Sequence, residues 1–128
     1  MQQNPVYSDV VAEVKAFLLQ RVRDCDSAGI ARSRILIDPG FGFGKTLAHN
    51  LALLRALPEF AALGVPVLAG LSRKSMIGAI TGRALADRLA GSITLAALAA
   101  ERGARIIRAH DVAQTVDAVR LVAALRAE

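Results

Sequence analysis

Apolar residues follow two alternating patterns along this chain. Stretches with apolar positions three and four residues apart predict amphipathic helices, and short continuous apolar runs between them predict buried strands. The helical spacing predicts a first helix that has Ser8 as its N-cap and ends before Gly29. It predicts three further helices, with a single helical turn at 76–80; they span 47–57, 84–102 and 112–125.

The apolar runs predict three strands, at 35–37, 65–70 and 104–109, of which the first is expected to be fully buried and the second buried. Helices and strands alternate, and no segment between them is typical of a hairpin turn. This order predicts parallel strands joined by helical crossovers. We therefore expect an α/β fold with three parallel strands and four helices in a single region, residues 1–128. Such a region is either part of a (β/α)8 barrel or an open sheet.

Composition excludes several classes of protein. Apolar residues make up 54% of the 128 positions and charged residues 21%, which excludes intrinsic disorder. The net charge of +5 is compatible with a nucleic-acid partner, but the cations are scattered singly and only four Phe and one Tyr can stack on bases. A small anionic substrate explains the charge more simply, so we expect no nucleic-acid partner.

Cysteine content and apolar stretches bear on location. Cys25 is the only cysteine, which excludes an internal disulfide, and the two histidines are too few for a Cys/His zinc site. The longest uncharged apolar stretch, 89–100, is shorter than the ~20 residues of a membrane span. Residues 1–5 lack the features of a signal peptide. We expect a cytoplasmic protein that does not bind membranes.

Polar and glycine-rich loops follow all three predicted strands. These loops are Asp38–Lys45, Ser72–Ser75 and Arg108–Asp111. In parallel α/β folds, ligands bind at the carboxyl ends of the strands, where loops and helix N-termini meet. We therefore expect the three loops to form one site.

The first of these loops matches neither common nucleotide motif. A Walker A loop has four residues between its first glycine and Gly-Lys-Thr, whereas three residues separate Gly40 from Gly44. The dinucleotide fingerprint needs a glycine where Lys45 stands. Two interpretations remain: an ordinary turn, or a tight loop whose backbone approaches a flat ligand between Phe41 and Phe43 as apolar walls.

Charged side chains in the loops suit a polar or anionic ligand. Asp38 can bind the N–H groups of a guanidine-like edge. Lys74 can bind a carboxylate or phosphate, or belong to a solvated basic loop. Arg108 follows an apolar run, so its charge must be paired or point into the cleft. His110 can donate to an anion or cap a helix. His49 and Asn50, near a helix start, are expected to be capping and surface residues.

Three motifs together are specific to one family. They are Asp38–Lys45, Gly70–Gly78 and Arg108–Val112, and residues 1–5 and 88–92 accompany them. In these motifs the chain closely resembles the dihydropteroate synthases of bacteria, over essentially its whole length. The resemblance implies the last strands of a (β/α)8 barrel. It also implies a transferase of folate biosynthesis, a sulfonamide target, which joins 6-hydroxymethyl-7,8-dihydropterin pyrophosphate to p-aminobenzoate and releases pyrophosphate.

The resemblance gives a role to individual residues around the pterin and the leaving group. It implies that Asp38 binds the amino-pyrimidine edge of the pterin. Lys74 contacts the pterin and lines the approach of p-aminobenzoate. Arg108 stacks along the pterin and, with His110, takes the pyrophosphate. Lys74 and Arg108 are therefore the expected catalytic residues.

Further residues are expected to hold the second substrate. The resemblance implies that Ser75 binds the p-aminobenzoate carboxylate. Gly42 and Phe43 form part of the wall beside its ring. Small-molecule substrates are thus the expected partners, together with a second copy of the chain, in a homodimer that covers the open strand edges.

The resemblance also implies groups that these 128 residues lack. Mg²⁺ is expected to assist the departure of pyrophosphate, with its ligand in the part of the family's sequence that precedes the position of Met1. No residue of this chain is expected to bind a metal. The same preceding part carries further pterin contacts and two mobile loops, so we expect the isolated chain to be incomplete or inactive.

Two alternatives stay open. The pterin-binding domain of a corrinoid-dependent methyltransferase shares the barrel and the aspartate contact. That class, however, has no p-aminobenzoate or pyrophosphate for Ser72–Ser75 and Arg108–His110 to hold. The second alternative is a half-barrel without catalytic activity that folds by self-association through its open strand edges.

Overall fold

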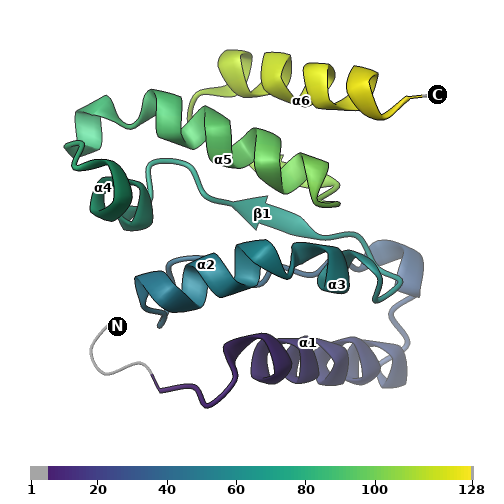
Figure 1. Cartoon of the computed structure of the whole chain (residues 1–128). Coiled ribbons are helices and arrows are strands. Elements are labelled where there is room, and N and C mark those ends of the chain that lie inside the picture. Colours follow the sequence, from purple (N-terminus) through teal and green to yellow (C-terminus); the bar gives the residue numbers. More distant parts are fainter. Residues whose placement is uncertain (1–5, 128) are drawn as a thin grey trace.

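Helices and short strand segments alternate in the structure (Figure 1). A computed structural model describes residues 6–127; segment 1–5, part of the family resemblance, lies outside the described residues. The elements are α1 (Val10–Ser27), η1 (Arg32–Arg34), α2 (Leu47–Arg55), α3 (Leu57–Ala61), β1 (Leu68–Gly70), α4 (Ser75–Thr81), η2 (Leu85–Asp87), α5 (Leu89–Glu101), β2 (Ile106–Arg108) and α6 (Val112–Arg126), where η denotes a 3-10 turn.

β1 and β2 form a two-stranded parallel sheet. Their register places Gly70 beside Arg108 at the carboxyl ends. A third segment joins through one parallel bridge between Ile37 and Val67, and the Ile37 carbonyl accepts the Leu68 N–H at 2.8 Å. The ends of three chain segments therefore lie at one edge.

The structure has two strands and a bridge where three strands were predicted. Segment 35–37 follows η1 directly, and Pro39 comes two residues after Ile37. Proline has no N–H to donate, so a parallel ladder cannot continue through that position. The extended segment is therefore too short for a regular strand.

The described residues form six α-helices, where four helices and one helical turn were predicted. The predicted helix 47–57 ends earlier, at Arg55, and a further short helix, α3, begins at Leu57, because Pro58 in the first turn of α3 cannot donate to the carbonyls of α2. The predicted helix 84–102 begins later, at Leu89. The predicted single turn is a full helix, α4, which ends at Gly82 with φ 75°. Within residues 6–127, every helix is too short or too polar to traverse a lipid bilayer.

The first helix begins with a different cap from the predicted one. Asp9, and not Ser8, is the N-cap: its Oδ1 accepts the Ala12 N–H at 3.1 Å. In return, Glu13 Oε2 accepts the Asp9 N–H at 2.9 Å. These two bonds satisfy N–H groups at the helix start that have no partner within the helix.

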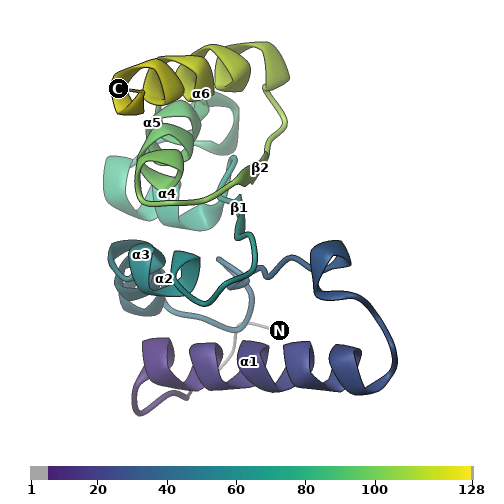
Figure 2. The same ribbon diagram turned by 90° about the vertical axis from the view of Figure 1, so that its right-hand side faces the viewer.

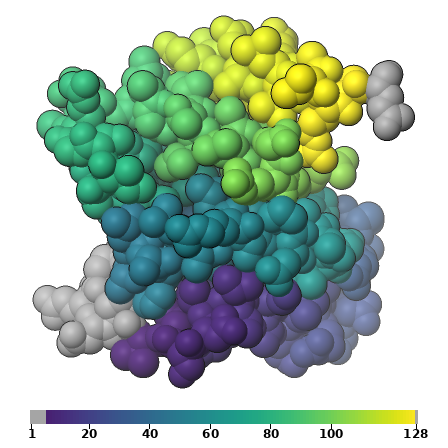
Figure 3. Space-filling model, viewed as in Figure 1, coloured from purple at the N-terminus to yellow at the C-terminus, as the bar shows by residue number. Residues whose placement is uncertain are grey.

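The α-helices stack along one side of the strands (Figures 1 and 2). Successive segments of the chain lie one above another, from the first helix at the bottom of the view to the last at the top (Figure 3). Val67, Ala69 and Leu71 are at most 2% exposed, because alternate residues of the strand point to the helices. Leu36 and Ile106 are 43% and 39% exposed. The expectation of a fully buried strand is therefore wrong for Leu36, because the described α-helices pack against the other face, and Ile106 is accessible for the same reason.

One hydrophobic core joins the first half of the chain to the strands. Its largest fully buried side chains are Phe41, Leu53, Leu57, Phe60 and Val67. The short helices α2 and α3 supply three of them, and Phe41 enters from the glycine-rich loop. The loop is therefore anchored to the core by an aromatic ring.

Replacing Phe60 by alanine tests this core. Phe60 is 0% exposed, so Phe60→Ala leaves a cavity and is expected to lower the free energy of unfolding by about 3–5 kcal/mol. Urea denaturation followed by circular dichroism measures the change. The matched control is Phe17→Ala, at a side chain that is 62% exposed, where we expect less than ~0.5 kcal/mol. Equal losses in the two variants would contradict the close packing around Phe60.

Candidate functional site

The carboxyl ends of the parallel segments bring a carboxylate and a guanidinium side chain together. Arg108 is the last residue of β2, and its Nη1 lies 3.4 Å from Oδ2 of Asp38, the residue after the Ile37 bridge. The two side chains are 55% and 31% exposed, so solvent screens their attraction and the pair adds little to stability. Its importance is its location, at the edge where ligands bind in parallel α/β folds.

Gly70 makes room for the Arg108 side chain. The two residues are opposite each other in the parallel register and therefore share one face of the sheet. A Cβ on Gly70 would lie 2.5 Å from Nη2 and 2.9 Å from Cζ of Arg108. The guanidinium thus crosses β1 over a residue without a side chain, and it reaches Asp38 on the far side.

Segment 38–45 is a tight loop with three positions whose backbone conformation only glycine adopts without strain. Gly40, Gly42 and Gly44 have φ values of 76°, 84° and 62°. Asp38 Oδ1 accepts the Gly40 N–H at 2.8 Å. The aspartate therefore closes the turn with one oxygen and pairs with a cation through the other.

Asn50 holds the middle of this loop. Its Oδ1 accepts the Gly42 N–H at 2.8 Å, and the residue is 4% exposed. The expectation of a surface residue is therefore wrong, because Asn50 stands on the same face of α2 as the buried Leu54, four residues later. The neighbouring His49 caps the helix as predicted, in a reciprocal pair of hydrogen bonds with Thr46 at 3.0 and 3.2 Å.

The two phenylalanines of the loop lie in different environments. Phe41 is 0% exposed and belongs to the core, so the expectation that it forms a wall of the site is wrong. Phe43 is 53% exposed, and Nζ of Lys74 lies 4.7 Å from its ring centroid. Of the pair, Phe43 alone offers an accessible apolar surface.

Lys74 lies across the glycine loop. Its Nζ donates to the Phe41 carbonyl, and its Cδ would lie 3.1 Å from a Cβ on Gly42. Burial lowers the pKa of Lys74 below its usual value of 10.5; the like charge of Arg108 lowers it further, and Asp38 raises it. The ammonium group is therefore held in place while it lacks full hydration.

A second lysine, to which the sequence motifs give no role, faces the same loop. Lys45 Nζ donates to the Gly40 carbonyl at 3.0 Å. Burial lowers its pKa, while Asp38 raises it, and its charge in turn lowers the pKa of Lys74. Lys45, Lys74 and Arg108 thus give this edge an excess of positive charge, which suits a polyanion.

His110 and Ser75 lie at the margin of this group. His110 Nδ1 is 2.8 Å from Oγ of Ser72, and the same oxygen accepts the His110 N–H at 3.2 Å. Ser75 is the exposed first residue of α4 and adjoins Lys74 in the chain. The sequence-predicted residues that direct contacts or close approach bring together are Asp38, Gly42, Phe43, Lys74 and Arg108.

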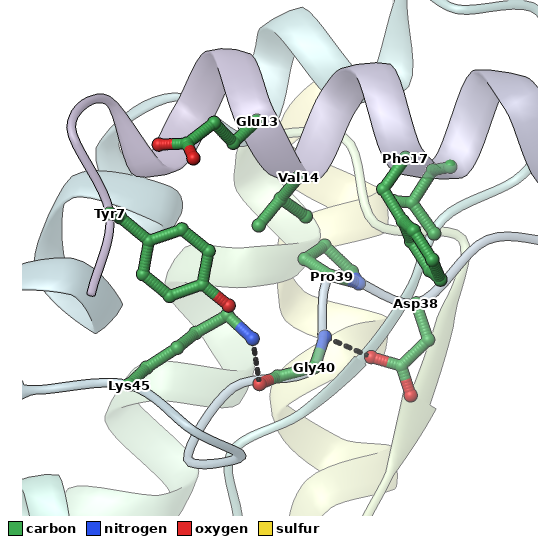
Figure 4. A pocket seen from close by; sticks show the side chains of 9 residues that line it. Tyr7, Glu13, Val14, Phe17, Asp38, Pro39, Gly40 and Lys45 are labelled. Carbon is green, nitrogen blue, oxygen red and sulfur yellow. Dashed lines mark hydrogen bonds between the residues drawn. The ribbon is translucent and has the colours of Figure 1, made fainter. Parts of the chain in front are cut away.

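A pocket of about 350 Å³ opens beside Asp38 (Figure 4). It lies between the start of α1 and the glycine loop. Phe17 and Val14 line its apolar side, and the Lys45 ammonium and Tyr7 border its polar side. An apolar cleft with a few converging polar groups is typical of a small-molecule site.

The described residues do not fit a magnesium site. Mg²⁺ binds through carboxylates, waters and substrate phosphates. Within residues 6–127, no three His, Cys, Asp or Glu side chains form a group that can hold a metal ion. The Asp38 carboxylate stands among the positive charges of Arg108, Lys45 and Lys74, which disfavour a further cation beside it.

Comparison with other sequences gives one family. The profile of the family described as pterin binding enzyme matches residues 1–110. The chain is 50% identical over 124 residues to the dihydropteroate synthase of Escherichia coli strain K12, a match that covers 97% of this chain and 44% of the relative. The chain thus spans less than half the length of that relative.

Solved structures share the architecture. The dihydropteroate synthase from Xanthomonas albilineans in complex with 7,8-dihydropteroate matches with a TM-score of 0.94 at 53% identity, over 100% of this chain and 49% of that one. A structure of the enzyme from the same organism with 4-aminobenzoic acid matches with a TM-score of 0.93 at 55% identity, over 97% and 46%. The α/β arrangement described above is therefore that of these enzymes over the matched part.

Two substitutions are expected to move the pKa of Lys74 in opposite directions. Arg108→Gln removes a like charge and should raise it, whereas Asp38→Asn removes an opposite charge and should lower it. NMR titration of the Lys74 side-chain carbons, assigned by their loss in Lys74→Arg, measures both changes. Arg105→Gln, just before β2, is the matched control and should leave the value unchanged. Shifts of one sign in both site variants would refute the arrangement.

Proposed function

The chain belongs to the pterin binding enzyme family, and we propose that its site serves the dihydropteroate synthase reaction of folate biosynthesis. In this reaction, 6-hydroxymethyl-7,8-dihydropterin pyrophosphate and p-aminobenzoate give 7,8-dihydropteroate and pyrophosphate. One observation carries the proposal: Arg108 pairs with the Asp38 carboxylate, and the Lys74 ammonium, whose charge interacts with both, lies over the exposed Phe43 ring. A flat amino-heterocycle needs the carboxylate, a leaving polyanion needs the cations, and an aromatic acid needs the apolar surface.

We assign Asp38 to the pterin. A carboxylate can accept two N–H groups of a guanidine-like edge through parallel hydrogen bonds. Each of its oxygens has two lone pairs, so the bonds from the Gly40 N–H and from Arg108 leave capacity for a ligand. The glycine loop beside it presents backbone without side chains, which allows a flat ring to approach closely.

Lys74 and Arg108 are assigned to the charge that develops during the reaction. As the bond to pyrophosphate breaks, its electron pair leaves with the polyanion and the pterin carbon becomes cation-like. The aniline nitrogen of p-aminobenzoate then attacks that carbon and loses a proton. Cations held in fixed positions stabilise the departing charge without reorganising during the step. His110, which Ser72 orients, adds a donor at the same strand end.

The second substrate is assigned to the surface formed by Phe43 and Gly42. The exposed ring gives an apolar wall, and the adjoining Lys74 ammonium lies over it. The Ser75 hydroxyl, at the first position of α4, is available to the p-aminobenzoate carboxylate. Sulfonamides carry an aniline ring and should compete for this surface.

The wider context of the site is part of the proposal. We infer that residues 6–127 form the last strands of a (β/α)8 barrel and that the protein acts in the cytoplasm. Mg²⁺ is expected to assist pyrophosphate departure through ligands other than the described residues, which bring no suitable group together.

A grafted enzyme tests the function directly. The chain replaces the matched segment of the Escherichia coli dihydropteroate synthase, with which it is 50% identical, and 7,8-dihydropteroate formation is measured with both substrates and Mg²⁺. We expect activity in the graft. Lys74→Ala and Arg108→Ala should each lower kcat/KM by at least ~100-fold, the scale for loss of a preorganised electrostatic contact.

The helix cap supplies the control for the graft. His49→Ala removes a capping residue of α2 and should change kcat/KM by less than about threefold. A folded graft without activity would contradict the proposed function. A loss under threefold in Lys74→Ala or in Arg108→Ala would remove that residue from the proposed site. The same assay on the isolated chain, with Lys74→Ala to exclude contaminating host enzyme, checks the expectation that the chain alone is inactive.

We further propose that copies of the chain associate as a homodimer. The segment 35–37 and β2, which carries the exposed Ile106, are the two outer segments of the described sheet, and the surface of an unpaired strand edge favours pairing with another chain. Sedimentation equilibrium at micromolar concentration should therefore give a mass above the 13.5 kDa of one chain. Ile106→Lys places a charge on that surface and should reduce the association. A monodisperse species of 13.5 kDa would count against the dimer.

A further inference from the structure

Arg73 has an unusual backbone conformation. Its φ of 57° lies in the left-handed region, which no other non-glycine residue among 6–127 adopts. It is the third residue of a turn that the Lys74 N–H closes by donating to the Leu71 carbonyl at 3.3 Å. Positive φ at this position of a turn favours glycine or asparagine, because an L side chain crowds the backbone there. An arginine at this position therefore needs compensating contacts.

Three sets of contacts hold Arg73 in this conformation. Its N–H donates at 2.9 Å to Oγ of Ser92, a residue of α5 that is 4% exposed. Its carbonyl accepts from Arg88 Nη1 at 3.0 Å. Its Nε and Nη2 donate to the two carboxylate oxygens of Asp111 at 3.3 and 3.0 Å, a bidentate pair that fixes the guanidinium plane.

Two neighbouring interactions join this turn to the end of β2. Ser72 pairs with His110, and Arg73 pairs with Asp111, so consecutive residues of one loop meet consecutive residues of the other. The Arg73 guanidinium is committed to Asp111 and does not serve as an anion ligand beside Lys74. The latter residue follows directly in the chain, so any rotation of the turn would move it.

We propose that the Arg73–Asp111 ion pair is a positioning pair, which holds the strained turn and thereby places Lys74 over the Phe43 ring and the glycine loop. Neither residue of the pair is proposed to touch a substrate. The catalytic consequence rests on the function proposed above, whereas the placement of Lys74 does not. The proposal is therefore testable with and without turnover.

Ring-current shifts report the placement of Lys74 in the full chain. Its ammonium lies 4.7 Å from the Phe43 centroid, so its Hε protons should resonate upfield of those in Phe43→Leu, which defines zero shift. In Arg73→Gly, glycine tolerates the positive φ but lacks the guanidinium. We expect Arg73→Gly to lose at least half of the upfield shift. Because glycine adopts the positive φ without strain, the backbone at this position should not lower the thermal unfolding midpoint of the variant below that of the unaltered chain.

Two further variants keep the test independent of the folding of Arg73→Gly. Arg73→Lys keeps the charge but lacks the bidentate fork, and Asp111→Asn keeps an acceptor but lacks the charge; both should lose an intermediate part of the shift. Asp24→Asn is the matched control, because it breaks an exposed ion pair with Arg21 on α1 and should leave the shift unchanged. An unchanged Lys74 shift in the folded variants of the pair would overturn the proposal.

The grafted enzyme separates this proposal from the proposed function. If the graft is active, Arg73→Gly should lower kcat about 10- to 100-fold with KM changed less than threefold, as expected for a misplaced catalytic group. An active graft whose kcat is insensitive to Arg73→Gly and Asp111→Asn would overturn the positioning role. An inactive graft of the unaltered chain, with the Lys74 shift lost in Arg73→Gly, would instead refute the function and support the pair.

Discussion

Parallel pairing of short segments brings the loops of the candidate site to one edge. Ile37 is bridged to Val67, and Gly70 is opposite Arg108. The carboxyl ends of the three extended segments therefore lie side by side. Asp38 and Arg108 are 70 positions apart in the sequence, yet this pairing brings their side chains to 3.4 Å. Because the helices pack against the opposite face, the same pairing leaves the charged groups accessible. A slip of one residue in either register would turn one of these side chains toward the core.

Three cations, Lys45, Lys74 and Arg108, act on one another and on Asp38 at this edge. Burial lowers the pKa of both Lys45 and Lys74, and their mutual repulsion and Arg108 act in the same direction on Lys74. The Asp38 carboxylate compensates only in part. An incoming polyanion would stabilise the charged form of these lysines, so ligand binding and lysine protonation are linked at this site.

The sequence predicts the order of elements and the loops that meet, because apolar periodicity and the positions of glycine record them directly. The end of α2 before Pro58 and the short segment before Pro39 also have a local signal, because proline donates no hydrogen bond. The burial of Asn50 has a local signal in its spacing from Leu54.

Other features have no local signal. Phe41 and Phe43 are two positions apart in one loop, and only the packing of the core decides that the first is buried and the second accessible. The ion pair between Arg73 and Asp111 joins residues 38 positions apart, so it is a property of tertiary structure alone. Sequence motifs thus point to chemical groups, whereas the residues that position them emerge from the fold.

The missing side chain at Gly70 has a genetic consequence. Every amino acid that a single base change can substitute for glycine carries a Cβ, and a Cβ at this position would lie 2.5 Å from the Arg108 guanidinium. Charge, polarity and size of the new residue are secondary to that first carbon. Each missense change of this codon therefore forces the same flexible guanidinium to shift from its position over β1.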